Sequence, residues 1–374
     1  MFGTPIELFK LFGIPIRLDA SWFIVAALVV WSLATGAFPY MEPGLAPPTY
    51  WLMGAAGAIG LFASIVVHEF FHARVARRNQ IPMRGITLFV FGGVAEMGAE
   101  PGSARAELRM AAAGPLASIA IALLGFGVSD AMRGFWPAPV VLVIEYLALL
   151  NGVLAAFNLL PAFPLDGGRI FRAALWTWKK DLAWATRVAS RTGSAFSIVF
   201  IAAGVVGVLL GNLVTGMWWV LIGLFLRRAS TVSYQQVLLR QALAGERIGR
   251  FMTRNPVSVP AATSIAELVD SYMYKYHHTL FPVVDGGTLL GCVTARQVKS
   301  VPREEWAKRT VGSLGAPRGS DNTIGPDADA LEALALMRRS GQPRLMVAED
   351  GNLVGIVTLK DLLQFFALKL ELEG

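Results

Sequence analysis

The chain has 374 residues, of which 55% are hydrophobic and only 16% are charged. A soluble globular protein carries about 25% charged residues, so the composition excludes an ordinary soluble enzyme and indicates an integral membrane protein. The net charge of +7 does not indicate a nucleic-acid partner, because the basic residues gather at the ends of apolar runs, where they orient helices in a bilayer. The single cysteine, Cys292, excludes an internal disulfide and fits a reducing compartment.

Residues 1–19 mix apolar and basic side chains without the cleavage pattern of a signal peptide. We expect them to form a short amphipathic lead-in along the membrane surface. A spanning helix needs about 20 mostly apolar residues. The sequence predicts a polytopic α-helical membrane domain over residues 1–230, with about six spans near residues 21–38, 51–76, 108–128, 140–160, 195–210 and 215–226.

Basic residues orient these spans. Clusters of arginine and lysine follow the second, fourth and sixth spans, whereas the loop after the first has none. Positive charge is retained on the cytoplasmic side of a membrane. The sequence therefore predicts a multi-pass plasma-membrane protein with both termini in the cytoplasm.

Residues 81–97 are apolar but too short to span. Residues 87–91 have the pattern of a strand, Gly92 and Gly93 that of a turn, and residues 94–95 that of a second strand. Non-helical backbone at membrane depth is tolerated only beside protein or a wet cavity. The pattern thus predicts a membrane-associated β-hairpin at an aqueous cleft; the alternative is an ordinary interfacial loop.

The strongest motif is His68-Glu-Phe-Phe-His72, at the end of the second span. Positions i and i+4 share one face of a helix, so both imidazoles can bind one Zn²⁺ while Glu69 acts as general base on a water molecule. The alternative is structural, with two hydrogen-bonded histidines and Glu69 paired with Arg74 or Arg77.

A catalytic zinc site needs a third protein ligand, and Asp166 is the best candidate. His68 lies about 26 Å along a helix that begins at Trp51, at 1.5 Å per residue. The fourth span runs in the same direction and ends just before Asp166, so both motifs lie at comparable depth. A plain turn before Arg169 is the alternative.

Two asparagines belong to the fourth span. The amide of Asn158, beside the predicted site, can hydrogen-bond a substrate backbone or a developing oxyanion, or else join two helices. Asn151 has only the helix-packing interpretation.

Charged residues become frequent after Gly245, and two units repeat at an offset of about 64 residues. Residues 281–294 parallel residues 345–358, each with the pattern strand, turn, strand, between helical stretches. The pattern predicts a soluble α/β module, with a linker at residues 231–245 and repeats at residues 246–305 and 306–370.

The membrane domain resembles the site-2 protease family of intramembrane metalloproteases. The resemblance rests on His68–His72 in an inward-running span, on Asn158 with Pro164-Leu-Asp-Gly-Gly168, and on similar segments at residues 13–22 and 91–93. It implies one Zn²⁺ per chain bound by His68, His72 and Asp166, with Glu69 as general base. It also implies that the hairpin at Gly92 and Gly93 presents an edge strand to an unwound substrate.

The tail resembles a tandem pair of cystathionine-β-synthase (CBS) domains. Such pairs commonly bind ATP, ADP or AMP and regulate the attached domain. The usual ribose contact stands here as Thr358 and Asp361, whereas the first repeat has Gln297 in place of the aspartate. The alternative is a purely structural or dimerising tail, and a homodimer through these domains is compatible with either interpretation.

These features predict a zinc metalloendopeptidase that cuts transmembrane or membrane-associated proteins, regulated by adenine nucleotide and in contact with membrane lipid. One alternative is a CBS-gated transporter or channel with a structural metal site, which leaves the predicted catalytic residues unused. Another is an inactive relative that only captures membrane proteins, against which the intact Glu69 argues.

Overall fold

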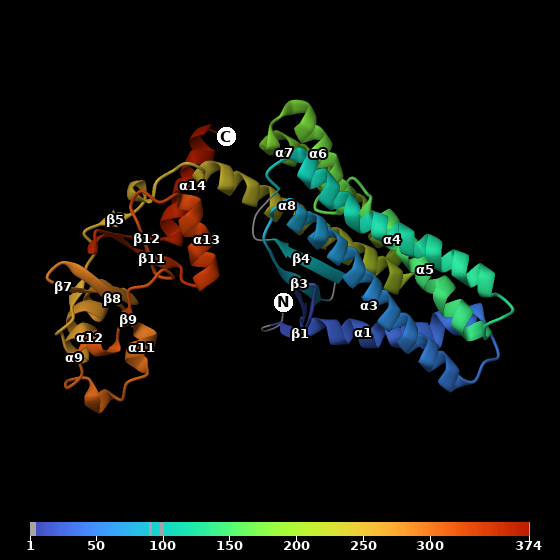
Figure 1. The fold of residues 1–374 in the computed structure, drawn as a ribbon, viewed down its shortest axis with the longest axis horizontal. Helices are drawn as coiled ribbons and strands as arrows, with labels where there is room; N and C mark the ends of the chain where they lie inside the picture. The colour runs from blue at the N-terminus through green and yellow to red at the C-terminus, as the bar shows by residue number, and fades with distance from the viewer. Residues whose placement is uncertain (1–4, 90–91, 98–100, 374) are drawn as a thin grey trace. The chain divides into compact units, whose positions relative to one another are not determined.

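The computed structural model describes residues 5–89, 92–97 and 101–373. The chain forms two compact units, Met1–Gln235 and Gln236–Gly374. The first contains the long helices and a small sheet, and the second contains a mixed sheet with short helices (Figure 1).

Among the described residues, five helical segments are long and apolar enough to cross a membrane. They are Ser21–Met41, which comprises α1 (Ser21–Ser32), the π-helical turn η1 (Leu33–Ala37) and α2 (Phe38–Met41), and then α3 (Pro47–Arg78), α4 (Ala104–Met132), α5 (Ala138–Asn158) and α7 (Leu182–Leu209). The sixth predicted span lies in α8 (Leu213–Leu243), where Arg227 and Arg228 follow a shorter apolar stretch. The polytopic helical architecture is therefore confirmed.

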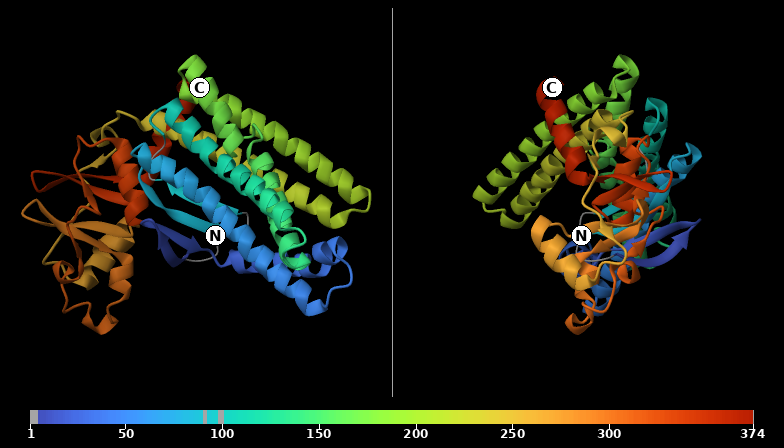
Figure 2. Two further views of the ribbon diagram at one scale, coloured as in Figure 1. Left: turned by 45° about the vertical axis from the view of Figure 1, so that its right-hand side comes forward. Right: turned by 90° about the vertical axis from the view of Figure 1, so that its left-hand side faces the viewer.

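Helix α3 packs against α1, α4 and α5 at the centre of the first unit (Figures 1 and 2). Asn151 of α5 is fully buried, and its amide donates hydrogen bonds to Ser64 Oγ of α3 at 3.0 Å and to the Leu147 carbonyl at 2.8 Å. Such bonds between helices substitute for missing water. The helix-packing role predicted for Asn151 is confirmed.

A four-stranded sheet lies beside α3 (Figure 2), in the order β1 (Ile6–Leu11), β2 (Ile14–Leu18), β3 (Met83–Phe89), β4 (Gly92–Met97). Strands β2 and β3 are parallel, and the other pairs are antiparallel. Ile14 and Ile16 of β2 pack with Ile86 of β3 and Ala73 of α3. The predicted amphipathic lead-in is thus a β-hairpin, in which Ile6, Leu8, Phe9 and Phe12 remain exposed.

The predicted hairpin is present as the antiparallel pair β3 and β4, and residues 90 and 91 of its predicted first strand lie outside the described residues. The turn predicted at Gly92 and Gly93 is wrong. Both glycines belong to β4, where Gly92 pairs with Phe89 and Gly93 with Leu88 of β3. A Cβ on Gly93 would lie 2.7 Å from Glu69 Cγ. Glycine stands there because α3 passes close to the strand, whereas a glycine pair in a sequence ordinarily signals a turn.

Helix α6 (Asp166–Lys179) and the first half of α7 were not predicted. Helix α6 is strongly amphipathic, and several basic residues interrupt its apolar pattern. It ends at Lys179, where the C-cap residue Lys180 has a φ of +55°. Asp181 then caps α7 by accepting a hydrogen bond from the Trp184 N–H at 3.0 Å. Hydropathy alone identifies spans, and these helical segments carry too many charges to resemble one.

The second unit confirms the predicted repeat of strand, turn, strand. Strands β7 (Leu280–Asp285) and β8 (Thr288–Thr294) correspond to β11 (Arg344–Glu349) and β12 (Asn352–Thr358), at the expected offset. The connecting turns, Gly286-Gly287 and Asp350-Gly351, have positive φ at both residues, as tight antiparallel hairpins require. The main sheet runs β10-β11-β12-β8-β7-β6, with β5 on β12 and β9 on β8.

Short elements complete the two repeats, and α8 continues through most of the predicted linker. The first repeat adds η2 (Ile248–Arg250), β5 (Thr253–Arg254), β6 (Val259–Pro260), α9 (Ile265–Glu267), η3 (Leu268–Met273), α10 (Tyr274–Tyr276), α11 (Ala295–Lys299) and η4 (Arg303–Glu305). The second adds α12 (Val311–Leu314), β9 (Ala316–Pro317), β10 (Thr323–Ile324), α13 (Ala330–Ser340) and α14 (Leu359–Glu373). Each repeat has its own buried apolar core.

Candidate metal centre

The two histidines of the motif lie on the face of α3 that packs against α4. His68 is 3% exposed and His72 is 8% exposed. Gly114 of α4 lies directly opposite, and a Cβ there would overlap both Nε2 atoms. The imidazoles fit between the helices because α4 has no side chain at that position.

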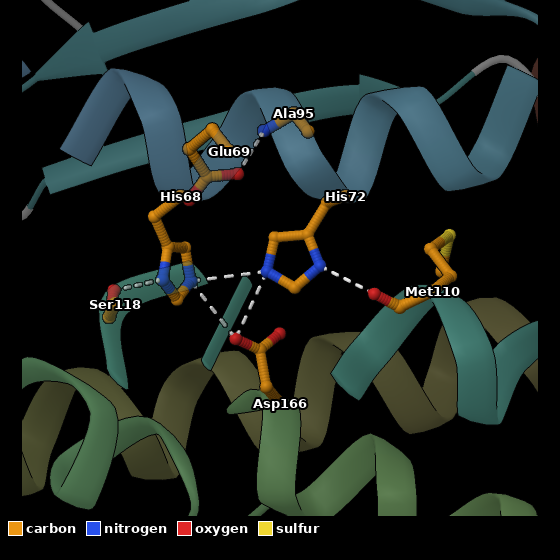
Figure 3. A network of polar contacts seen from close by, with 7 residues as sticks. All are labelled: His68, Glu69, His72, Ala95, Met110, Ser118 and Asp166. Carbon is orange, nitrogen blue, oxygen red and sulfur yellow. Dashed lines mark hydrogen bonds and ion pairs between the residues drawn. The ribbon is translucent and has the colours of Figure 1, made fainter. Parts of the chain in front are cut away.

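Asp166 is the first residue of α6, and the two glycines after it position that helix. The chain before α6 folds back so that a Cβ on Gly167 would overlap the Leu159 carbonyl, and one on Gly168 would overlap the Phe163 backbone. The Asp-Gly-Gly sequence therefore allows the preceding loop to pack against the start of the helix. The Asp166 carboxylate consequently points toward α3 (Figure 3).

Three ligand atoms from these elements converge. Asp166 Oδ2 lies 3.2 Å from His68 Nε2 and 3.1 Å from His72 Nε2, and the two Nε2 atoms are 3.1 Å apart. Among the described residues, this is the single group of three side chains arranged to hold a metal ion. Ligands about 2.0–2.1 Å from a tetrahedral zinc ion lie about 3.3 Å from one another, so the triangle is nearly of the right size.

Both imidazole rings contact α4 through Nδ1, so that their Nε2 atoms can face a cation. His72 Nδ1 donates to the Met110 carbonyl oxygen at 2.7 Å, and His68 Nδ1 lies 2.9 Å from Ser118 Oγ. A carbonyl only accepts, so the Nε2 of a neutral His72 carries a lone pair. That lone pair faces a carboxylate oxygen and a second ring nitrogen. Electron pairs that converge in this way fit a bound metal ion, and partners on Nδ1 are typical of metal-binding histidines.

Burial and neighbouring charge change the pKa of the Asp166 carboxyl group in opposite directions. Burial alone would raise the pKa of its carboxyl group, but His72 and His68, when their imidazoles are protonated, lower that pKa well below its usual range. A carboxylate that stays ionised suits metal binding, since the ligand must be deprotonated.

Glu69 follows His68 on α3, and its carboxylate faces the β-sheet side of the centre (Figure 3). Its Oε2 accepts a hydrogen bond from the Ala95 N–H of β4 at 3.2 Å. The alternative pairing of Glu69 with Arg74 or Arg77 is not observed; Arg77 instead donates to the Phe12 carbonyl at 2.7 Å.

A cavity of about 590 Å³ opens onto the three candidate ligands and Glu69. Its wall includes Asn158 at the end of α5, Gly92 and Gly93 of β4, and residues of α8 such as Trp218. The structure therefore brings every residue predicted for the membrane site to one cavity. The side-chain amide of Asn158 makes no hydrogen bond to another described residue, in contrast to that of Asn151.

Sequence reasoning missed the contribution of α4. Met110, Gly114 and Ser118 recur every four residues along one helix face, and each contacts an imidazole or leaves room for it. One contact uses a backbone carbonyl and another uses an absent side chain, so neither has a chemical signature in the sequence.

The predicted nucleotide contacts lie in the second unit. Asp361 Oδ2 accepts hydrogen bonds from Thr358 N at 2.9 Å and Thr358 Oγ1 at 2.8 Å. Gln297 Oε1 binds Thr294 in the same way, at 2.8 Å for both atoms. However, Gln297 Nε2 donates to the Leu314 carbonyl at 3.2 Å, so its side chain is used within the fold. Asp361 keeps a second, negatively charged oxygen.

Comparison with protein families finds two matches. The model of peptidase family M50 matches residues 56–141 and 135–200. The CBS domain matches residues 248–304 and 320–368.

Similar proteins are known from bacteria and archaea. Rip3 of Mycobacterium tuberculosis, whose name describes a zinc metalloprotease, is 35% identical over 95% of this chain and 91% of its own length. Zinc metalloprotease MJ0392 of Methanocaldococcus jannaschii is 30% identical over 98% of this chain and 97% of its own. A solved site-2 protease from the same archaeon has 31% identity and a TM-score of 0.43, covering 61% of this chain and 94% of that chain. The names of Rip3 and MJ0392 favour the protease interpretation over a transporter or channel.

Replacement of Gly114 by alanine should abolish zinc binding, because the added methyl group would overlap both Nε2 atoms. Gly127→Ala on the same helix is the matched control, since a Cβ there meets no atom within 4 Å. Zinc per chain, measured by plasma mass spectrometry on purified protein, should fall from about one to near zero in Gly114→Ala alone. Full zinc content in that variant would contradict the geometry.

Proposed function

Because the chain belongs to peptidase family M50, the site-2 type of intramembrane zinc metalloprotease, we propose that His68, His72 and Asp166 bind its zinc ion. We propose further that Glu69 is the general base. The observation that carries this proposal is the convergence of the three ligand atoms within 3.2 Å of one another, beside the Glu69 carboxylate.

Zinc at a site with three protein ligands supplies Lewis acidity and makes water nucleophilic near neutral pH. The chain's own groups supply proton transfer and orientation. Glu69 accepts a proton from the water that attacks the scissile carbonyl and passes it to the leaving amine as the C–N bond breaks. The Ala95 N–H holds the Glu69 carboxylate in the cavity. The Asn158 amide, which is free of other described partners, donates to the substrate backbone.

The substrate is a transmembrane or membrane-associated protein whose segment has become extended. An α-helix hides its carbonyls in its own hydrogen bonds, so it must unwind before attack. Strand β4 is an edge strand of the described sheet, and Gly92 and Gly93 line the cavity. An exposed edge pairs with an extended chain through backbone hydrogen bonds, so we assign β4 to substrate binding.

Glu69→Gln should keep zinc and the fold but lower the cleavage rate about 10²–10⁴-fold, because the amide cannot accept the proton. The rate can be followed with a fluorescent, unstructured polypeptide in detergent micelles. The matched control is Glu145→Gln, which removes a carboxylate paired with Arg133 at 3.1 Å, away from the cavity.

Substrate cleavage by Glu69→Gln near the parental rate would rule out Glu69 as the general base. A parent that holds zinc but cuts no substrate would instead revive the inactive, substrate-capturing relative. The Glu69→Gln variant also serves to trap substrates in native membranes, where mass spectrometry can identify them.

The CBS pair, we propose, binds an adenine nucleotide at Thr358 and Asp361 and thereby regulates the protease. The support is the carboxylate of Asp361, one of whose oxygens is bonded to Thr358 while the other remains available to ribose hydroxyls. The equivalent Gln297 offers no charged acceptor and is held by Leu314.

Asp361→Ala should weaken AMP binding to the full-length protein about 10–100-fold, since a hydrogen bond to a charged group contributes about 1.5–3 kcal/mol. Gln297→Ala at the equivalent position should change it less than about threefold. Isothermal titration of both variants checks this. Equal effects of the two substitutions on AMP binding would contradict a nucleotide site confined to the second repeat.

For location, we propose the plasma membrane with both termini and the CBS pair in the cytoplasm, and the exposed apolar side chains of β1 against lipid. The arginines in the last turn of α3 and those within α6 support this orientation. A C-terminal green fluorescent protein fusion should fluoresce, and an alkaline phosphatase fusion at the same point should be inactive. The reverse pattern would invert the topology.

A further inference from the structure

Glu107 and Arg172 form an ion pair that is almost completely buried within the helical unit. Their side chains are 0% and 4% exposed, and Arg172 Nε donates to Glu107 Oε1 at 2.7 Å. Apart from the metal centre, both partners of every other ion pair between described residues are at least 19% exposed. Two charges lose their hydration in such a pair, which is seldom worthwhile for stability alone.

Arg172 contacts the chain on both sides of the third ligand. It belongs to α6, which begins at Asp166, and its guanidinium lies 4.7 Å from the centre of the Phe163 ring in the loop before that helix. The guanidinium stacks on the aromatic face while its N–H groups reach Glu107. One side chain therefore fixes both the loop and the helix between which Asp166 stands.

Glu107 occupies the first turn of α4, the helix that supports the two imidazoles. Met110, Gly114 and Ser118 follow it along α4, and these residues accept from His72, make room for both rings and contact His68. The ion pair thus joins the element that carries the carboxylate ligand to the element that orients the imidazole ligands.

We infer that the Glu107–Arg172 pair positions Asp166 against His68 and His72, and so sets the geometry and affinity of the metal centre. Neither residue lines the catalytic cavity, so both are positioning residues rather than catalytic ones. This inference rests on the proposed function, since it takes Asp166 to be a ligand. Partners that orient metal ligands are typically worth 10–100-fold in metal affinity.

A purely structural role predicts a different response to substitution. Replacing a buried ion pair by apolar residues of similar volume often preserves stability. The double variant Glu107→Leu with Arg172→Met should therefore regain the thermal stability lost in either single variant. It cannot regain the two directional N–H contacts to Glu107 Oε1 that fix α6 on α4.

The experiment measures metal binding to the purified full-length protein, which requires no substrate. Zinc affinity is measured by competition with a chromophoric chelator, and site geometry by the visible absorption of Co²⁺ bound in place of zinc. The variants are Glu107→Gln, Arg172→Met, Arg172→Lys and the apolar double variant. Asn151→Ala, which removes a buried hydrogen bond between α5 and α3, is the control for lost stability.

We expect at least tenfold weaker zinc binding and altered cobalt absorption in Glu107→Gln, Arg172→Met and the double variant. Arg172→Lys, which keeps the charge without the planar fork, should fall between parent and Arg172→Met. Asn151→Ala should melt at a lower temperature with the parental cobalt spectrum. Parental zinc affinity in the stable double variant would overturn the inference, as would an equal change in Asn151→Ala.

If the larger substitutions prevent folding, Arg172→Lys decides, and parental affinity in it overturns the inference. The parental protein separates this inference from the proposed function. A parent that binds neither zinc nor cobalt would refute the metal ligands themselves, whereas a binding parent with unchanged variants refutes only the role of the ion pair.

Discussion

Two imidazoles and a carboxylate meeting among apolar helices are the constraint on which the rest of the structure depends. Groups of this kind are costly to bury unless they are paired or coordinate a metal. The packing around them meets that requirement locally. Met110 and Ser118 of helix α4 form hydrogen bonds with the Nδ1 atoms of the two imidazoles. The chain before α6 folds back and directs Asp166 toward their Nε2 atoms. The long helices therefore serve to hold a small polar site in fixed geometry.

Much of this organisation could be predicted from residue types and spacing. The spacing of His68 and His72 places both on one helix face, and charge asymmetry placed Asp166 at matching depth. The distances from Asp166 Oδ2 to the two Nε2 atoms agree with that placement. The repeat in the tail also agreed closely with the observed strands. These features have strong signals because chemistry or repetition demands particular residues at particular intervals.

What could not be predicted depends on tertiary contact. Gly93 resembles a turn residue, yet it lies within β4. It is glycine there because Glu69 occupies the space that a side chain would need. The strands at residues 6–18 gave no clear pattern, since β1 exposes most of its side chains. Helix α6 carries too many charges to be recognised as a membrane span. Its amphipathic pattern is explained only by the elements that pack against it. In each case a distant segment decides the local conformation.

The composition of β4 bears on which proteins this enzyme can choose between. Where the strand borders the cavity it offers Gly92, Gly93 and Ala95, whose side chains are absent or a single methyl group, together with the apolar side chains of Val94 and Met97. If β4 binds substrate as we propose, its small residues would interact mainly with the peptide groups of the substrate, and its two larger side chains would add only apolar contacts. Discrimination would then depend on how readily a given membrane segment gives up its helical form, and on which proteins are delivered to the enzyme. Selectivity of this kind is a property of the client's conformational stability more than of any consensus sequence.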